Sequence, residues 1–297
     1  MSGQDTLRRF LFEDFPVRGE IVRLDDAWRA VLDRHDYPPA VRDLLGEALA
    51  ATVLLASTLK FDGMLTLQVQ GEGDLHLLVA QCGSDLSVRG LAKWKGEDPR
   101  GSFAELTGGA RLAITIENRR SRERYQGIVA ADTETLAGCL ENYFANSEQL
   151  PTRLWLAADD RRAGGMLLQQ LPGDPARADA DPDAWRRTGM LAATVTRGEL
   201  LGLDLKGLLG RLFHEEDLRL ADGDPVVFSC SCTRGRVESA LKLLGREELE
   251  DLLADEGVIQ VRCEFCNQGY DLDPVDVERI LAGDGGPPPP PGSASVH

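Results

Sequence analysis

Four cysteines near the C-terminal end of the sequence have the residue type and spacing of a metal-binding group. Cys230 and Cys232 are one residue apart, Cys263 and Cys266 are two apart, and 30 residues separate the pairs. Four thiolates can bind one tetrahedral Zn²⁺ at zinc–sulfur distances of ~2.3 Å. Two local disulfides or four unrelated thiols are the alternatives. Only six cysteines occur in 297 residues, so this clustering favours one zinc per chain.

The first pair departs from the commonest zinc-binding spacing. Most structural sites use Cys-x₂₋₄-Cys on a turn, whereas Cys230-Ser231-Cys232 needs a tight backbone bend. The same pair is a candidate for a local disulfide if the metal leaves. Two interpretations are open: a permanent structural zinc, or a thiol switch in which zinc holds the thiolates. Spacing alone favours the structural zinc.

Charge argues against nucleic acid and membranes as partners. The formal net charge is −16, and residues 229–283 contain six Lys or Arg and twelve Asp or Glu. A nucleic-acid-binding protein needs basic surface to neutralise phosphates, and an anionic membrane attracts basic segments. The N-terminus lacks the basic start and apolar run of a signal peptide. The longest apolar stretch, around Ala48–Ala56, is far shorter than the ~20 residues of a membrane span. We therefore expect a cytoplasmic protein, in which paired cysteines indicate metal or redox chemistry.

Residues 1–171 mix strand and helix patterns. Alternating apolar and polar residues predict strands at Leu65–Gln70, Asp74–Val79, Leu86–Trp94, Arg111–Ile116, Tyr125–Ala130, Arg153–Ala157 and Met166–Leu171. Helical periodicity predicts helices at Asp26–Arg34, Ala40–Lys60 and Glu134–Ser147. Strands grouped together with few helices indicate an α+β fold with antiparallel sheets.

A proline-rich break near residues 172–182 starts a predicted linker, residues 172–225. Residues 183–216 have helical periodicity, with leucines at 200, 201, 205, 208, 209 and 212 on one face. Five glycines interrupt it, at 189, 198, 202, 207 and 210. Because an interior glycine costs ~1 kcal/mol relative to alanine, we expect metastable helices that depend on docking. The alternative is that the glycines cap and separate short helices.

Residues 226–282 are predicted to form a small zinc domain. Helices are expected at Arg236–Leu244, Glu247–Ala254 and Val275–Leu281, and a strand at Val258–Val261. Leu249, Leu252 and Leu253 are expected on the inner face of the second helix, with Gly257 as its C-cap and Asp273 capping the third. So small a domain is marginal without a metal. The Gly- and Pro-rich tail, residues 283–297, is expected to be disordered.

The cysteine centre, with Tyr270 just beyond it, resembles that of the heat shock protein 33 family of redox-regulated holdase chaperones. Further segments that resemble the family are Phe15–Val22, Leu59–Gly63, Glu123–Gly127, Ser147–Arg153, Gly164–Leu168 and Phe213–Glu216. The acidic linker and the proline-rich tail are less typical of the family. The four cysteine positions show no departure from it.

The resemblance implies a mechanism. Zinc bound by Cys230, Cys232, Cys263 and Cys266 would be released on oxidation, with disulfides Cys230–Cys232 and Cys263–Cys266 forming. The zinc domain would then unfold, the linker would undock, and residues 1–171 would bind unfolding client proteins and form the dimer. It also implies ATP-independent activity under oxidative stress, an oxidised homodimer, and ATP-dependent chaperones that refold the clients. No Walker-type loop occurs in the sequence, consistent with that.

Other polar and thiol residues indicate no catalytic site, so no enzyme activity is expected. Cys82 and Cys139 lie in apolar patterns and are expected to be buried, and His214 is expected to pack within the linker. Two rival classes remain: a thiol–disulfide oxidoreductase using Cys263 and Cys266, and an interaction protein with a structural zinc. The oxidoreductase is disfavoured because Cys263 lacks a thioredoxin-like setting between strand and helix.

Overall fold

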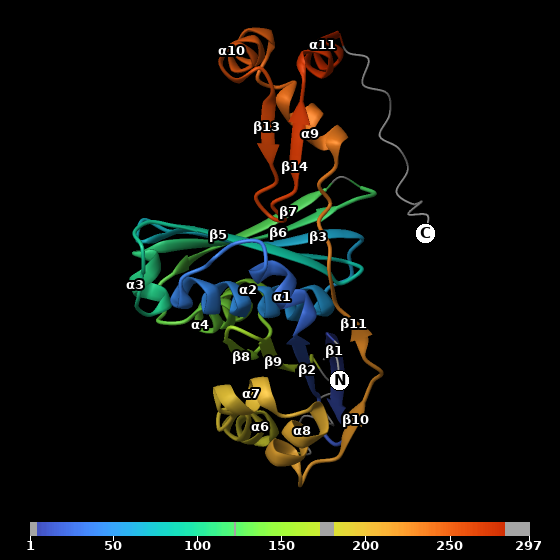
Figure 1. Ribbon diagram of the computed structural model, residues 1–297. Helices are drawn as coiled ribbons and strands as arrows, with labels where there is room; N and C mark the ends of the chain where they lie inside the picture. Colours follow the sequence, from blue (N-terminus) through green and yellow to red (C-terminus); the bar gives the residue numbers. More distant parts are fainter. Residues whose placement is uncertain (1–4, 122, 173–180, 283–297) are drawn as a thin grey trace. The chain divides into compact units, whose positions relative to one another are not determined.

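The computed structural model describes residues 5–121, 123–172 and 181–282 (Figure 1). Contacts divide the chain into two compact units, Met1–Ser229 and Cys230–His297. Each unit is described by itself below. The predicted disorder of residues 283–297 and most of the proline-rich break lie outside the described residues.

The first unit contains two antiparallel sheets. The first sheet has the order β10-β1-β2-β9-β8, with β11 also paired to β1. Its strands are β1 (Thr6–Phe12), β2 (Val17–Leu24), β8 (Thr152–Ala158), β9 (Ala163–Gln170), β10 (Leu218–Leu220) and β11 (Asp224–Pro225). The second sheet has the order β12-β5-β4-β3-β6-β7. Its strands are β3 (Gly63–Gln70), β4 (Leu75–Gly83), β5 (Ser87–Trp94), β6 (Ala110–Asn118), β7 (Arg124–Ala131) and β12 (Val227–Phe228). Among the described strands, β12 alone runs parallel to its neighbour, β5.

Helix α2 (Pro39–Thr58) lies between the two sheets and packs against strands of both (Figure 1). Pro39 occupies the first turn, where its missing N–H costs nothing. From Leu44 to Ala56 the helix is buried at nearly every position. This explains why its sequence is apolar all round and has no polar face. The largest apolar cluster of the protein forms around it.

Shorter helices complete the first unit. They are α1 (Asp26–Leu32), α3 (Phe103–Thr107), α4 (Leu136–Tyr143) with the π-helical turn η1 (Phe144–Glu148), α6 (Ala184–Ala192), α7 (Arg197–Gly202) and α8 (Leu205–Phe213). Leucines of α7 and α8 form a second apolar cluster with residues of the first sheet, including Phe10, Phe12 and Met166. The rings of Phe213 and Phe12 lie 5.2 Å apart. The last three helices therefore depend on the sheet for their burial.

The C-terminal unit contains three helices and one hairpin among its described residues. These are α9 (Arg234–Leu241), α10 (Arg246–Glu256), α11 (Pro274–Ala282), β13 (Ile259–Arg262) and β14 (Gly269–Leu272). Gly257 ends α10 with φ +72°, which favours glycine. Asp273 accepts a 2.8 Å hydrogen bond from the N–H of Asp276 at the start of α11. Both predicted caps are confirmed.

The α+β class with antiparallel sheets and a four-cysteine C-terminal region is confirmed. The predicted strands and long helices are present, with shifted ends. The prediction missed α3 and the strands β1, β2, β10, β11, β12 and β14. It extended the first zinc-domain helix to Leu244, whereas α9 ends at Leu241. It also placed Leu252 on the inner face of α10, but this side chain is 41% exposed. The finer division into residues 1–171, 172–225 and 226–282 stays a prediction.

Candidate metal centre

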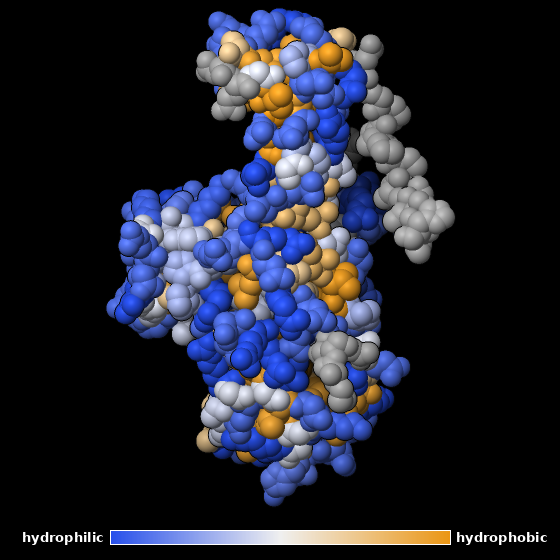
Figure 2. All heavy atoms as spheres, in the orientation of Figure 1, coloured by the Kyte–Doolittle hydropathy of each residue, from blue (hydrophilic) through white to orange (hydrophobic). Residues whose placement is uncertain are grey.

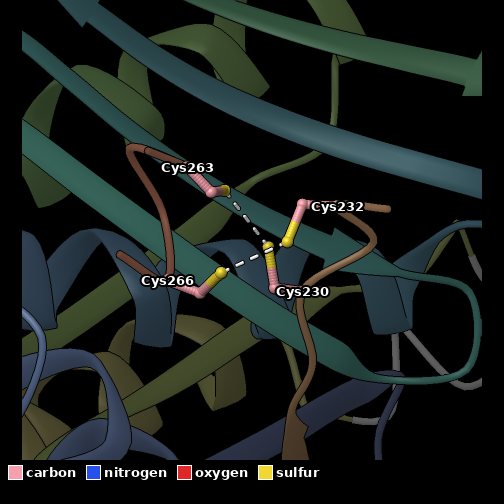
Figure 3. A group of neighbouring side chains, drawn as sticks. All are labelled: Cys230, Cys232, Cys263 and Cys266. Atoms are coloured by element: carbon pink, nitrogen blue, oxygen red, sulfur yellow. Dashed lines mark hydrogen bonds between the residues drawn. The ribbon is translucent and has the colours of Figure 1, made fainter. Parts of the chain in front are cut away.

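The four cysteines of the C-terminal unit converge on one point. Cys230 and Cys232 lie in the segment before α9, and Cys263 and Cys266 lie in the loop between β13 and β14 (Figure 3). All four Sγ atoms lie within 4.8 Å of one another. The Sγ atoms of Cys230 and Cys263 are 3.7 Å apart, and those of Cys232 and Cys266 are 3.3 Å apart. Residues far apart in the sequence therefore form one thiol cluster.

The β13–β14 hairpin positions the second pair. Its strands pair from Ile259 opposite Leu272 to Arg262 opposite Gly269. In the loop, the N–H of Cys263 donates to the carbonyl of Gln268 at 3.0 Å, and the N–H of Asn267 donates to the carbonyl of Cys263 at 2.8 Å. Asn267 has φ +58°, a conformation that asparagine adopts more readily than most residues. This tight turn brings Cys263 and Cys266 together.

Arg236 holds the bend in the first pair. Its Nη1 donates to the carbonyl oxygen of Ser231 at 2.9 Å and to Ser231 Oγ at 2.6 Å. Thr233 caps α9 by accepting a hydrogen bond from the N–H of Arg236. The tight bend expected between Cys230 and Cys232 is thus stabilised by a side chain that sequence reasoning did not single out. The sequence did contain one indication of this contact, a basic residue four positions after the Cys-x-Cys pair.

Tyr270 adds a hydrogen-bond donor to the centre. It lies on β14, and its hydroxyl donates to the Sγ of Cys232 at 3.2 Å. This hydrogen bond is the main reason that the pKa of Tyr270 lies above its ordinary value. A donor at this distance stabilises negative charge on sulfur. Tyr270 therefore supports a thiolate at Cys232, and sequence reasoning noticed it only through the family resemblance.

The protonation state of the thiols depends on what binds them. Burial raises the pKa of Cys232, and it raises the pKa of Cys266 to about 12. Free thiols at these positions would hold their protons at neutral pH. A metal ion binds thiolates and must displace those protons, so its binding releases protons.

The geometry of the cluster fits a tetrahedral metal ion. Zinc–sulfur bonds of ~2.3 Å in a tetrahedron give sulfur–sulfur distances of ~3.8 Å. The separations of 3.7 Å and 3.3 Å lie near that value, and far from the ~2.05 Å of a disulfide. All four cysteines are free thiols. The cluster could therefore hold one metal ion. Both short distances are between a cysteine of the first pair and a cysteine of the second, so they do not favour a disulfide within either pair.

The core beneath this centre is small. Its buried members are Leu241, Leu249, Ile259, Leu272, Val277 and Ile280. Several large apolar side chains of the unit remain exposed, and Figure 2 shows hydrophobic atoms on its surface. The most exposed of them are Leu243, Leu244, Leu252 and Val275. So small a core provides little stability alone, and a bound metal would add to it.

The remaining candidates lie outside the centre. Cys82 and Cys139 are fully buried in the first unit, as predicted, and burial raises the pKa of Cys82 to about 12. The side chain of His214 is 70% exposed, so the prediction that it packs within the linker is wrong. His214 follows the last residue of α8, where the chain turns into solvent. Among the described residues, no helix is long and apolar enough to cross a membrane.

The protein thus combines a two-sheet α+β body with a small unit built around four thiols that could hold a metal ion. The model of the Hsp33 protein family matches residues 5–273. The 33 kDa chaperonin of Nitrosococcus oceani is 50% identical over 281 residues, covering 95% of this chain and 96% of that protein. That of Methylobacillus flagellatus is 48% identical over 282 residues, with 95% and 96% covered.

The chain belongs to the Hsp33 family. The crystal structure of the 33 kDa chaperonin from Thermotoga maritima is similar in fold, with a TM-score of 0.79. It is 24% identical and covers 94% of this chain and 99% of that one. Family membership supports a chaperone function. The name chaperonin, which these relatives carry, describes a role that is not enzymatic. The ion, the redox chemistry and the clients are matters of proposal.

Proposed function

We propose that this protein is a redox-regulated, ATP-independent holdase chaperone with one Zn²⁺ bound by Cys230, Cys232, Cys263 and Cys266. The observation that supports it most is the convergence of four thiols on a unit with a very small core. In a Hsp33 family member, this couples the oxidation state of four sulfurs to the folding of the unit. When bound, zinc would keep the sulfurs as reactive thiolates.

The proposed chemistry is oxidation by peroxide. One thiolate attacks a peroxide oxygen, forming a sulfenic acid and releasing hydroxide. The neighbouring thiolate then attacks the sulfenic sulfur, so the disulfide forms and a second hydroxide leaves. Each disulfide thus uses one peroxide and two protons and yields two waters. We assign the disulfides to Cys230–Cys232 and Cys263–Cys266, which leaves no thiolate for the metal.

Loss of the metal would unfold the C-terminal unit. Structural zinc can contribute ~10–16 kcal/mol to small domains, more than six buried apolar residues are expected to supply. Peroxide therefore acts as a stability switch on residues 226–282. Cys82 and Cys139 do not take part, because they are buried away from oxidant.

Helices α6 to α8 form the second part of the proposed switch. Their docking on the first sheet uses apolar contacts and a few polar ones. Arg162 donates to the carbonyl of Leu201 at 3.1 Å, and Arg197 of α7 pairs with Asp43 of α2 at 2.5 Å. Undocking would expose the buried leucines of α7 and α8 and the aromatic residues beneath them. We propose that residues 172–225 are this linker and that residues 1–171 bind clients and dimerise.

The proposed partners follow from this surface. They are unfolded or aggregation-prone proteins, a second oxidised copy, and ATP-dependent chaperones that receive the clients. With a net charge of −16, neither nucleic acid nor an anionic membrane is proposed. We place the activity in the cytoplasm during oxidative stress.

The decisive experiment compares reduced and peroxide-treated protein in suppressing the aggregation of a heat-unfolding client. Zinc release and peptide mapping are measured on the same samples. The Cys82→Ala, Cys139→Ala double variant is the control and should switch like the parent. Activating disulfides that include Cys82 or Cys139 would contradict the site assignment.

The rival functions predict different results. Equal suppression by both redox states would leave a structural zinc in an interaction protein. Catalysed disulfide exchange on added substrates, without aggregation suppression, would favour an oxidoreductase.

A further inference from the structure

A cavity in the first unit lies between the first sheet and the start of α8. Its volume is about 330 Å³, within the size range of small-molecule sites. Three basic side chains line it, those of Arg8 on β1, Arg23 on β2 and Lys206 on α8. Because the protein as a whole has a net charge of −16, three cations around one cavity are a local exception to its charge.

The strand register places Arg8 and Arg23 on the same face of the first sheet. Ile21 lies opposite Arg8 and is two residues from Arg23 along β2. Side chains two apart on a strand point to the same face, and diagonal neighbours on paired strands lie within reach of long side chains. Ile21 belongs to the apolar cluster of α7 and α8, so this face is the one that α8 covers. Two arginines of the sheet and Lys206 of the helix therefore line the cavity from its two sides.

Two carboxylates also line the cavity, but each already has a partner. Asp25 forms an ion pair of 2.8 Å with Arg162. Asp204 caps α8 and accepts a 2.7 Å hydrogen bond from the N–H of Gly207. The cations in and beside the cavity therefore outnumber the anions.

The basic side chains keep donors for a ligand. Among the described residues, neither Arg8 nor Lys206 forms an ion pair or a side-chain hydrogen bond. Arg23 donates from one nitrogen to the carbonyl of Leu203, and a guanidinium has five N–H donors. Burial lowers the pKa of Arg23, so a negative charge nearby would stabilise its charged form. Lys206 lies in the first turn of α8, where the helix dipole favours negative charge, so helix stability gives no reason for a cation there.

We propose that this cavity binds a small organic phosphate, and that the bound ligand holds α8 in its docked position. A phosphate accepts paired N–H donors from arginine and attracts lysine as a point charge. The organic part would contact the apolar side chains of the wall, which are Ile21, Leu203, Leu205 and Leu208. Because the ligand contacts both the sheet and the helix, it opposes undocking. This control of undocking rests on the function proposed above, whereas ligand binding to the reduced protein does not.

The test uses phenyl phosphate as the probe, with inorganic phosphate and phenol as its two halves. Titration calorimetry measures binding to the reduced, zinc-loaded protein, and hydrogen exchange locates the ligand. Arg8→Gln and Lys206→Gln each remove one cation from the cavity. Arg219→Gln is the matched control, because it removes an exposed cation from β10 of the same sheet, outside the cavity.

We expect Arg8→Gln and Lys206→Gln each to weaken phenyl phosphate binding about tenfold, since each removes a charge-assisted contact. Arg219→Gln should bind like the parent, and inorganic phosphate and phenol should both bind more weakly than phenyl phosphate. Hydrogen exchange in residues 205–213 should slow when phenyl phosphate binds. If Arg8→Gln changes this exchange without ligand, the comparison is made with Lys206→Gln, whose side chain is exposed.

Three results would overturn the proposal. They are unchanged affinity in both cavity variants, phenol that binds as tightly as phenyl phosphate, and protection confined to residues outside the cavity. Inorganic phosphate that binds as tightly as phenyl phosphate would overturn the assigned ligand class.

Peroxide-treated protein separates this proposal from the holdase function. Phenyl phosphate at about ten times its Kd should make undocking about tenfold rarer. The parent should then need a higher temperature for activation, and Lys206→Gln should not. If the oxidised parent suppresses aggregation and the ligand leaves that temperature unchanged, the holdase function stands and control by the ligand fails. If the oxidised parent suppresses nothing, the holdase function fails, and binding to the reduced protein still decides whether the site exists.

Discussion

Replacing Gly210 by alanine should make the proposed undocking of α8 harder. Gly210 lies inside α8, is exposed, and an added Cβ would meet no atom within 4 Å. It has no positive φ, so alanine fits the helical backbone. None of the five linker glycines has a positive φ. They therefore do not act as left-handed helix caps, and they lie instead within or beside short helices.

The structure separates Gly210 from Gly207, for which the sequence predicts an equal effect. Gly207 lies in the first turn of α8, where its N–H donates to Asp204 Oδ1 at 2.7 Å. A Cβ at Gly207 would lie 2.8 Å from that oxygen and disturb the cap. The limit of ~2 kcal/mol for replacing both glycines therefore falls to ~1 kcal/mol, from Gly210 alone. A small undocked population would decrease about fivefold.

The assay measures client binding after peroxide treatment over a range of temperatures. Gly210→Ala should need a higher temperature than the parent, while peroxide releases zinc at the same rate because the thiols are unchanged. Gly207→Ala is the comparison in the same helix: its disturbed cap opposes the gain in helix propensity, so it should not raise the activation temperature. Hydrogen exchange must show that α8 is more stable in Gly210→Ala. If it is, and activation still occurs at the parent temperature, helix stability does not limit activation.

Three further predictions concern the metal centre and the core. Cys263→Ser should lose zinc and increase hydrogen exchange in residues 230–282 but not in the first unit; retained zinc would remove this residue from the ligand set. Tyr270→Phe should weaken zinc binding about tenfold in competition with a chelator, whereas Tyr125→Phe should not; equal affinities would show that the hydroxyl does not tune Cys232. Burial raises the pKa of Glu47 from 4.5 to about 7. The charged carboxylate therefore destabilises the folded state fully above about pH 7, and this destabilisation is absent below pH 4.5, where the group is protonated in both states. Glu47→Gln should raise the free energy of unfolding by up to ~3 kcal/mol at about pH 8 and little near pH 4.5; a gain independent of pH in urea titrations would contradict this.

Local chemistry made much of this protein predictable from its sequence. The four cysteines identify the centre because thiol type and short spacing are local properties. Alternation predicted strands such as β3, whose successive residues are buried and half-buried in turn. Caps such as Gly257 and Asp273 were predictable because each acts within one helical turn.

Strand β2 was missed because its surroundings conceal the pattern. Residues that point to either face of β2 are mostly buried. Helix α2 covers one face of the first sheet, and the apolar cluster of α7 and α8 covers the other. A strand buried on both faces does not alternate, so periodicity cannot reveal it. The class of fold was predictable, but the layer order was not.

The functional contacts that the sequence left undecided join distant residues. The hydrogen bond of Tyr270 to Cys232 and the pairing of β12 with β5 each depend on the path of the chain in three dimensions. The sequence by itself determined which side chains can bind a metal, because that follows from their chemistry. Only the tertiary structure decided that the two pairs converge and that the Tyr270 hydroxyl supports Cys232, because packing of residues far apart in the chain sets those neighbours.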